Sequence, residues 1–234
     1  MRQNVLHRLS WHVLCLLLLL LSAGCGGCGG GAGTGKVLIK LNWYPEAEHG
    51  GYYAAVVKHL YQDQGLDVEI LRGGDQVDVP GLVASGQAAF GVANADDVLL
   101  ARAQGRPVVA VMAPLQKGPQ CIMVHKESGI TRFDQLHGLT LAVERQAPYF
   151  KYLERKVDLT GVKVVPYSGG VSRFLEDPKY AQQGYVFSEP ILVRKAKGSA
   201  ERNAGTRCLM LYEVGYNPYT SALFTTESLI KDNP

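Results

Sequence analysis

The pattern of apolar and polar positions predicts alternating strands and helices from residue 37 onward. Residues 37–41 form a short apolar run typical of a strand, and Pro45 stops it. A helix is expected next, because one face of a 3.6-residue spiral collects His49, Tyr52, Tyr53, Val56, Val57 and Leu60. Gly65 is expected to end this helix, and residues 66–70 alternate apolar and polar side chains. A strand, a helix and a strand in this order indicate a crossover with parallel strands.

Similar patterns continue to the end of the chain. Further helices are expected at residues 75–86, 96–104, 133–138, 149–156 and 226–231. Further strands are expected at residues 88–93, 108–112, 121–124, 139–143, 162–165, 185–187, 207–212 and 222–225. The strand at 121–124 begins a second run of α/β units, and we expect the last two strands to cross back to the first. The pattern therefore predicts an α/β protein built in two halves.

Polar and aromatic residues follow two strands of the first half. Asn42, Trp43 and Tyr44 come directly after the first strand, and Asn94 follows the strand at 88–93. Ligands of open α/β sheets bind outside the carboxyl ends of the strands, so these residues are candidates for ligand contact. The next acidic pair, at positions 96 and 97, suits the positive end of a helix dipole at least as well as a ligand.

The second half presents two candidate loops. Ser188-Glu189-Pro190 follows an apolar run, and proline suits the first turn of a helix, so Ser188 or Glu189 is expected to cap that helix. Glu189 either only caps the helix or also contacts a ligand. Gly169 and Gly170 indicate a turn, or a loop whose N–H groups meet a ligand oxygen, and the turn is favoured.

Composition and charge narrow the function classes. The chain has 47% hydrophobic and 19% charged residues, which is typical of a globular protein. Its formal net charge is +3, and no basic run indicates a nucleic-acid partner. Histidines and cysteines lack the paired spacing of a metal site. Cys121 and Cys208 lie in apolar stretches, so two buried free thiols are favoured over a disulfide.

The amino terminus reads as an export signal. Arg2 and Arg8 precede an apolar core at residues 13–21 that is too short to span a bilayer, which predicts a signal peptide at residues 1–24. Residues 21–25, Leu-Ser-Ala-Gly-Cys, resemble a bacterial lipobox, and the alternative is ordinary cleavage with Cys25 incidental. We expect Cys25 to be lipidated, residues 25–35 to form a glycine-rich tether, and the protein to be periplasmic or on the cell surface, anchored to the membrane.

Several motifs together resemble a known family. They are Asn42-Trp43-Tyr44-Pro45, His49-Gly50-Gly51-Tyr52-Tyr53, Gly65-Leu66-Asp67-Val68-Glu69-Ile70 and Gly184-Tyr185-Val186-Phe187-Ser188-Glu189-Pro190. This set resembles the solute-binding proteins of ABC importers, in the branch that also contains thiamine-pyrimidine synthases, with sulfonate and taurine binders as cousins. The resemblance covers residues 36–234. It implies a type II periplasmic-binding-protein-like fold with lobes at 36–120 and 121–212, a return to the first lobe at 213–234, and a ligand cleft between the lobes. Resembling proteins continue further, so we expect this chain to be truncated at its carboxyl end.

The resemblance implies a monomeric binder, without a cofactor, that passes a small heteroaromatic such as a thiamine pyrimidine precursor to an ABC permease. Aromatic residues near the first strand favour a flat ring, which stacks well on such side chains. The residues expected to contact the ligand are Asn42, Trp43, Tyr44, His49, Tyr52, Asn94, Tyr149, Gly169, Gly170 and Glu189. A thiamine-pyrimidine synthase is the enzymatic alternative; such synthases use a lysine that holds pyridoxal phosphate, a histidine and a cysteine-rich run, and residues 185–189 contain no cysteine. A sulfonate, taurine or riboflavin binder is the other alternative.

Overall fold

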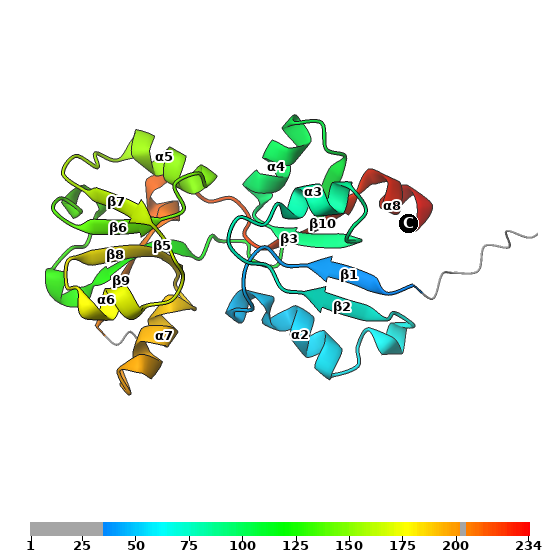
Figure 1. The fold of residues 1–234 in the computed structure, drawn as a ribbon, viewed down its shortest axis with the longest axis horizontal. Coiled ribbons are helices and arrows are strands. Elements are labelled where there is room, and N and C mark those ends of the chain that lie inside the picture. The colour runs from blue at the N-terminus through cyan, green and yellow to red at the C-terminus, as the bar shows by residue number, and fades with distance from the viewer. Residues whose placement is uncertain (1–34, 202–204) are drawn as a thin grey trace, which may run out of the picture. The chain divides into compact units, whose positions relative to one another are not determined.

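Two five-stranded sheets, each with helices on both faces, make up the computed structural model, which describes residues 35–201 and 205–234 (Figure 1). We refer to the two sheets with their helices as the first and second lobes. The predicted signal peptide, the lipidation site Cys25 and most of the glycine-rich tether lie outside the described residues. Within those residues, the longest apolar helices are still too short to cross a bilayer.

The first sheet has the strand order β2-β1-β3-β10-β4. Its strands are β1 Val37–Lys40, β2 Val68–Leu71, β3 Phe90–Ala93, β4 Val108–Met112 and β10 Ala222–Thr226. β1 runs parallel to β2 and β3, whereas β10 lies antiparallel between β3 and β4. The crossover predicted from the first motifs is therefore confirmed.

Neighbouring side chains of β1 pack on opposite faces of the first sheet, as the alternation of a strand requires. Leu38 packs with the core of α3 (Val79–Ala84) and α4 (Ala95–Ala103), and Ile39 packs with α2 (Gly50–Val57). Figure 1 shows α3 and α4 on one side of the sheet and α2 on the other. This arrangement places the loops after β1 and β3 together at the carboxyl edge of the sheet.

The second sheet has the strand order β7-β6-β8-β5-β9. Its strands are β5 Gln120–His125, β6 Thr140–Val143, β7 Lys163–Pro166, β8 Tyr180–Tyr185 and β9 Thr206–Met210. Ile122 packs toward α5 (Pro148–Lys156), and its neighbour Met123 packs toward α6 (Ser172–Glu176) and α7 (Glu189–Ala196). Short 3-10 turns and the last helix complete the structure: η1 Ala47–His49, η2 Gln62–Gln64, η3 Lys126–Ser128, η4 Phe133–Gln135, η5 Leu211–Val214 and α8 Glu227–Asp232.

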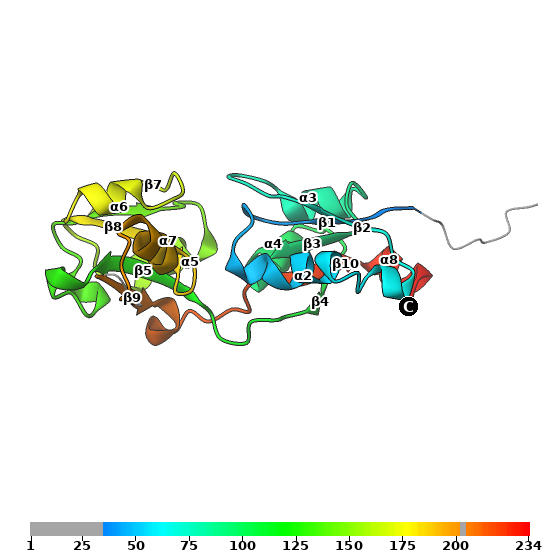
Figure 2. The same cartoon turned by 90° about the horizontal axis from the view of Figure 1, so that it is seen from below.

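Two connections join the lobes, one from β4 to β5 and one from η5 to β10 (Figure 2). They are tied to each other by a bridge between Leu115 and Thr220, and by a hydrogen bond of 2.7 Å from the Gly118 N–H to the Asn217 Oδ1. Ser221 follows directly with a φ of 54°, in the left-handed region that L-residues rarely adopt. The connections thus form a paired hinge that ends in a strained residue.

The first helix is shorter than predicted. α2 ends at Val57, because the backbone turns left-handed at His59 (φ 60°), and Gly65 ends the short turn η2 instead. Val57 and Leu60 were expected on the buried face, but they are 76% and 51% exposed. The buried stripe therefore covers only the first part of the predicted face.

Four other predicted elements were wrong in position, length or partner. The helix expected at 133–138 is only the three-residue turn η4. The strand expected at 185–187 is β8, which ends at Tyr185, and residues 186–188 form a turn. The strand expected at 207–212 does not cross back to the first lobe, since β9 pairs with β5 in the second sheet. The helix expected at 75–86 is reduced to α3, which Asp78 caps by accepting the Gly81 N–H. The helix α6 was not predicted at all.

Both remaining cysteines are free thiols, as predicted. Cys121 is buried, while Cys208 is only half-buried. Burial raises the pKa of the Cys121 thiol well above its ordinary value, so this group stays uncharged.

Candidate functional site

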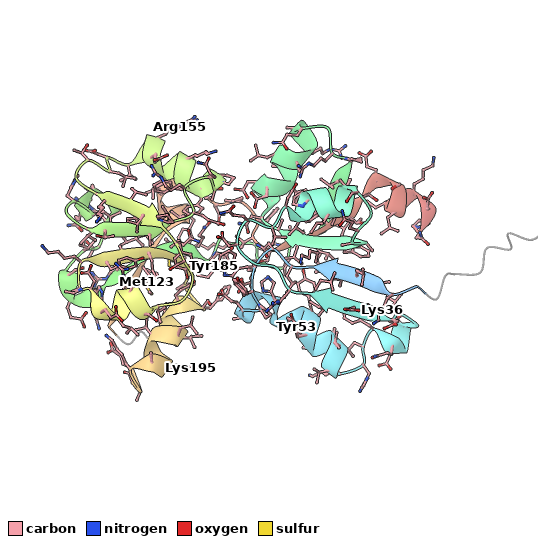
Figure 3. The ribbon with its side chains drawn as sticks, in the orientation of Figure 1. Lys36, Tyr53, Met123, Arg155, Tyr185 and Lys195 are labelled. Atoms are coloured by element: carbon pink, nitrogen blue, oxygen red, sulfur yellow. The ribbon has the colours of Figure 1, made fainter. Side chains whose placement is uncertain are left out.

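A cavity of about 780 Å³ lies where the carboxyl ends of strands from both lobes meet, and we call it the cleft. Its size is in the range of small-molecule sites. Residues that line the cleft follow β1 (Asn42, Trp43), β3 (Asn94), β6 (Glu144) and β7 (Tyr167), or end β8 (Tyr185). Figure 3 shows Tyr185 at the edge of the second lobe that faces the first.

The structure brings half of the predicted ligand residues to this cavity. Asn42, Trp43, Asn94, Tyr149 and Glu189 line it. Their contact with a ligand stays a prediction.

The other predicted residues lie near the cleft or behind it. Tyr44 is 48% exposed and packs edge-on against Trp43, and Tyr52 is buried in the core between α2 and the first sheet. Gly169 and Gly170 have φ values of 83° and 72° and form an open turn, in which the Gly170 carbonyl accepts a hydrogen bond from Gln182. None of these four is among the described residues that line the cleft.

His49 is fully buried and acts on the cleft through Asn42. The Glu46 backbone N–H donates to the His49 Nδ1, so the ring proton resides on Nε2, which lies 3.2 Å from the Asn42 Oδ1. Burial lowers the pKa of His49 to about 4, which keeps the ring neutral. Because His49 occupies the carbonyl side of the Asn42 amide, the amide N–H donors of Asn42 remain for the cleft that this residue lines.

Two aromatic rings from different lobes face each other. Trp43 of the first lobe and Tyr167 of the second lobe are nearly parallel, with ring centroids 6.4 Å apart and planes inclined by 19°. Trp43 also packs on the core cluster of the second lobe. The rings therefore stack on each other where the two lobes meet, and we call the place between them the slot.

Glu189 lies beside this slot, at the start of α7. Its Oε1 accepts a hydrogen bond of 3.2 Å from the Tyr167 hydroxyl, and its Oε2 accepts one of 2.6 Å from the Tyr185 N–H. The side chain lies so close to Gly184 that a Cβ atom at that position would come within 2.7 Å of the Glu189 Oε2. Burial, more than any neighbour, raises the pKa of Glu189 to about 7.

Asn94 is held by the second lobe and the hinge, and Tyr149 is held by β8 of its own lobe. The Asn94 Oδ1 lies 3.4 Å from both the Tyr185 hydroxyl and the Ser221 N–H, which donate to it. The Tyr149 hydroxyl donates to the Gln183 Oε1, which also accepts the Glu144 N–H at 2.6 Å. These bonds fix the floor of the cleft to the hinge and to β8.

Carboxylates dominate the charge of the cleft. The acidic residues on its wall are Glu46, Glu48, Asp75, Asp78, Asp96, Asp97, Glu144 and Glu189. The basic residues on its wall are Arg106 and Arg145, and Arg106 is paired with Asp78 at 2.6 Å. Burial raises the pKa of Glu48 and of Asp97 to about 7, because few cations offset the loss of water. Across residues 35–201 and 205–234, no cluster of His, Cys, Asp and Glu could hold a metal ion.

Sequence reasoning missed Glu46, Glu48, Tyr167 and Tyr185. Glu46 and Glu48 lie between the candidate residues Tyr44 and His49, so their charge was a usable signal. Tyr167 directly follows β7, and Tyr185 ends β8. Correct strand ends in the second half would have identified both tyrosines.

A model of the NMT1/THI5-like family matches residues 46–234. The 4-amino-5-hydroxymethyl-2-methylpyrimidine phosphate synthase THI11 of Saccharomyces cerevisiae is 35% identical over 106 residues, covering 45% of this chain and 31% of the synthase. A formylaminopyrimidine-binding protein of Halalkalibacterium halodurans is 32% identical over 105 residues, covering 45% of this chain and 32% of that protein. The matched segment thus spans about a third of these relatives.

Solved structures share the fold. The periplasmic aliphatic sulphonate binding protein SsuA of Escherichia coli superposes with a TM-score of 0.62 at 14% identity, covering 85% of this chain and 63% of that one. At such low identity the likeness speaks for the fold alone. The predicted two-lobed, periplasmic-binding-protein-like α/β fold is confirmed, and so is the predicted family resemblance.

Proposed function

Because this chain belongs to the NMT1/THI5-like family, we propose that it is the solute-binding protein of an ABC importer and carries a small aminopyrimidine. The first lobe comprises residues 36–120 and 213–234, the second lobe comprises residues 121–212, and the ligand closes the cleft between them. The relatives named above make, or bind, pyrimidines of this kind.

The ring slot carries the proposal. A flat ring inserted between two parallel rings needs about 7 Å between them, two contacts of about 3.5 Å. The Trp43 and Tyr167 ring centroids are 6.4 Å apart, a distance that includes any sideways offset, so the lobes must open before one heteroaromatic ring can stack between them. Because the two rings come from different lobes, a stacked ligand holds the lobes together.

Hydrogen-bonding groups beside the slot match an aminopyrimidine. The exocyclic amino group of the ligand donates protons, and the Glu189 carboxylate accepts them. The ring nitrogens accept protons, and the Asn42 amide that His49 orients can donate them. Both residues line the cleft.

Charge argues against a sulfonate or taurine ligand. An anion in this cleft would face many carboxylates, and the guanidinium of Arg106 is already paired with Asp78. Desolvated like charges repel strongly, so the carboxylates of the cleft favour a neutral or positively charged ligand over an anion. The shared fold with SsuA does not extend to its ligand chemistry.

A synthase is the second candidate function, supported by relatives such as THI11. Among the described residues that line the cleft there is no lysine, cysteine or histidine. His49 is buried behind Asn42, with both ring nitrogens in hydrogen bonds. These observations support a binder over an enzyme that attaches pyridoxal phosphate to a lysine.

Export completes the proposal. Lipidation of Cys25 would anchor a monomer to the membrane, where residues 25–35 leave it free to meet the permease. A binding protein uses this location to deliver its ligand, whereas a synthase that consumes a cytosolic cofactor does not.

Calorimetric titration with 4-amino-5-hydroxymethyl-2-methylpyrimidine tests the proposal. We expect Trp43→Ala and Glu189→Gln each to weaken binding about tenfold or more. The first removes a stacking face, and the second removes a charge-assisted hydrogen bond of about 1.5–3 kcal/mol, where 1.4 kcal/mol is tenfold. Tyr44→Ala and Glu154→Gln are the matched controls, since Tyr44 neighbours the slot without lining the cleft and Glu154 is exposed on α5. The site assignment is wrong if the first pair lowers only the melting temperature and leaves the affinity unchanged.

A further inference from the structure

We propose that the ligand carries a positive charge, and that a three-carboxylate site formed by Glu46, Glu48 and Glu189 holds this charge across the cleft. The inference rests on the proposed function and narrows its ligand to a cationic aminopyrimidine. It depends on residues of the first loop that the family motifs did not single out.

The three-carboxylate site spans both lobes. Glu46 and Glu48 come from the loop around η1 in the first lobe, and Glu189 begins α7 in the second. All three line the cleft. The Ser188 hydroxyl donates a hydrogen bond of 2.9 Å to the Glu46 Oε2, which brings the start of α7 against the first loop. A ligand at this point touches both lobes at once.

The Glu48 carboxylate lacks a hydrogen-bond donor for one of its buried oxygens. Its side chain is only 4% exposed, and its Oε2 is buried without a hydrogen-bond partner among the described residues. The Glu48 Oε1 lies 3.9 Å from the His49 Nδ1, but that nitrogen already accepts the Glu46 N–H and the ring is neutral. A buried carboxylate oxygen without a donor is costly, so a donor or a positive charge from the ligand is expected there.

The groups that surround the site add no positive charge. They are His49 on the first loop, Tyr167 after β7, Tyr185 at the end of β8 and Cys121 on β5. Of the cleft arginines, Arg106 is paired with Asp78 and Arg145 is exposed, and neither is among the charges that shift the pKa of Glu48 or Glu189. Burial and then repulsion from Glu46 and Glu189 raise the pKa of Glu48 to about 7. A neutral ligand leaves this repulsion in place, whereas a cation relieves it.

Proton linkage gives the inference a second readout. Near pH 7 the unliganded site holds part of its protons, because the pKa values of Glu48 and Glu189 are both about 7. A bound cation favours the charged carboxylates, so protons are released on binding. The affinity for a permanent cation should therefore increase as the pH rises from 5.5 to 7.5.

Two probes share the aminopyrimidine ring but differ in charge and in size, so the Glu48→Gln variant is needed to assign the difference to charge. Thiamine carries an aminopyrimidine ring and the permanent positive charge of its thiazolium, and 4-amino-5-hydroxymethyl-2-methylpyrimidine carries the ring without that charge. We expect thiamine to bind at least about tenfold tighter at pH 7.5, to bind tighter at pH 7.5 than at pH 5.5, and to release protons. Calorimetry in two buffers of different ionisation enthalpy measures this release.

Glu48→Gln keeps the shape of the side chain and removes its charge. It should lower the ratio of the thiamine affinity to the affinity for the uncharged pyrimidine about tenfold, while Glu154→Gln leaves this ratio unchanged. Equal affinities for the two probes, independent of pH and of Glu48→Gln, would overturn the three-carboxylate site but leave pyrimidine binding intact. If the folded protein binds neither probe, the inference and the proposed function both fail.

Discussion

Replacing Glu48 by glutamine is expected to stabilise the unliganded protein at high pH, although the same change weakens the binding of a cation. The pKa of this carboxyl rises from its ordinary value of 4.5 to about 7, chiefly through burial. The folded state therefore favours the protonated form, and wild-type stability is lost as the pH rises from about 4.5 to about 7, with no further loss above that. A difference of about 2.5 pKa units at 1.36 kcal/mol per unit gives at most about 3 kcal/mol.

Urea unfolding at several pH values measures this effect. The stability of Glu48→Gln should match that of the wild type near pH 4.5, exceed it progressively up to pH 7, and keep the full difference at pH 8. Saturating thiamine should reduce the difference at pH 8, because it binds the charged wild-type site more tightly. Glu154→Gln is the control and should show no pH-dependent difference. A Glu48→Gln protein that is less stable than the wild type by the same amount at pH 5 and pH 8 would refute the reasoning.

Three further changes test other parts of the structure. Gly184→Ala should weaken pyrimidine binding several-fold with little change in fold, because its Cβ displaces the Glu189 carboxylate. Calorimetry measures the affinity and circular dichroism the fold; unchanged affinity in a folded variant would contradict the prediction. Ser221→Gly should stabilise the protein by about 1 kcal/mol in urea unfolding, since glycine accepts a φ of 54° and the buried Ser221 hydroxyl has no described partner; a loss of stability would show that this side chain contributes packing instead. Cys25→Ala should release the protein from cell membranes, and continued membrane association at unchanged mass would contradict lipidation.

Much of the fold could be predicted because its strands follow simple patterns. The strand at 108–112 and the helices at 96–104 and 149–156 agree with β4, α4 and α5 to within one residue. Each has a short apolar run or a clear stop signal. The edge of the sheet that bears Trp43 and Asn94 followed from the same patterns.

The second lobe was harder to predict, because its runs of apolar residues do not coincide with its strands. The strand was predicted to include Val186 and Phe187 because they are apolar, yet Val186 is exposed. The strand in the structure, β8, ends before them and buries the polar Gln182. The Gln182 side chain is tolerated inside because it donates to the Gly170 carbonyl at 3.0 Å. A partner twelve residues away in sequence is not visible in a local pattern.

The way side chains face one another across the cleft could not be predicted, for the same reason. Trp43 and Tyr167 lie in different lobes, and only the packing of the two lobes makes them parallel. The repulsion among Glu46, Glu48 and Glu189 likewise arises from loops that meet in space. Sequence identified the loops but not which side chains face one another.

The position of β10 has a consequence for the order of events during synthesis on the ribosome. β3 and β4 are not hydrogen-bonded to each other; β10 fills the place between them, and it is made only after the whole second lobe. Until then the nascent first sheet lacks its fourth strand, a gap of about 9.6 Å, two strand spacings, across which β3 and β4 expose unpaired backbone groups. The second sheet consists of consecutive strands β5 to β9 and can close first. Synthesis therefore favours completion of the later lobe before the earlier one, and an incomplete chain released before residue 222 would expose two open strand edges where a molecular chaperone could bind.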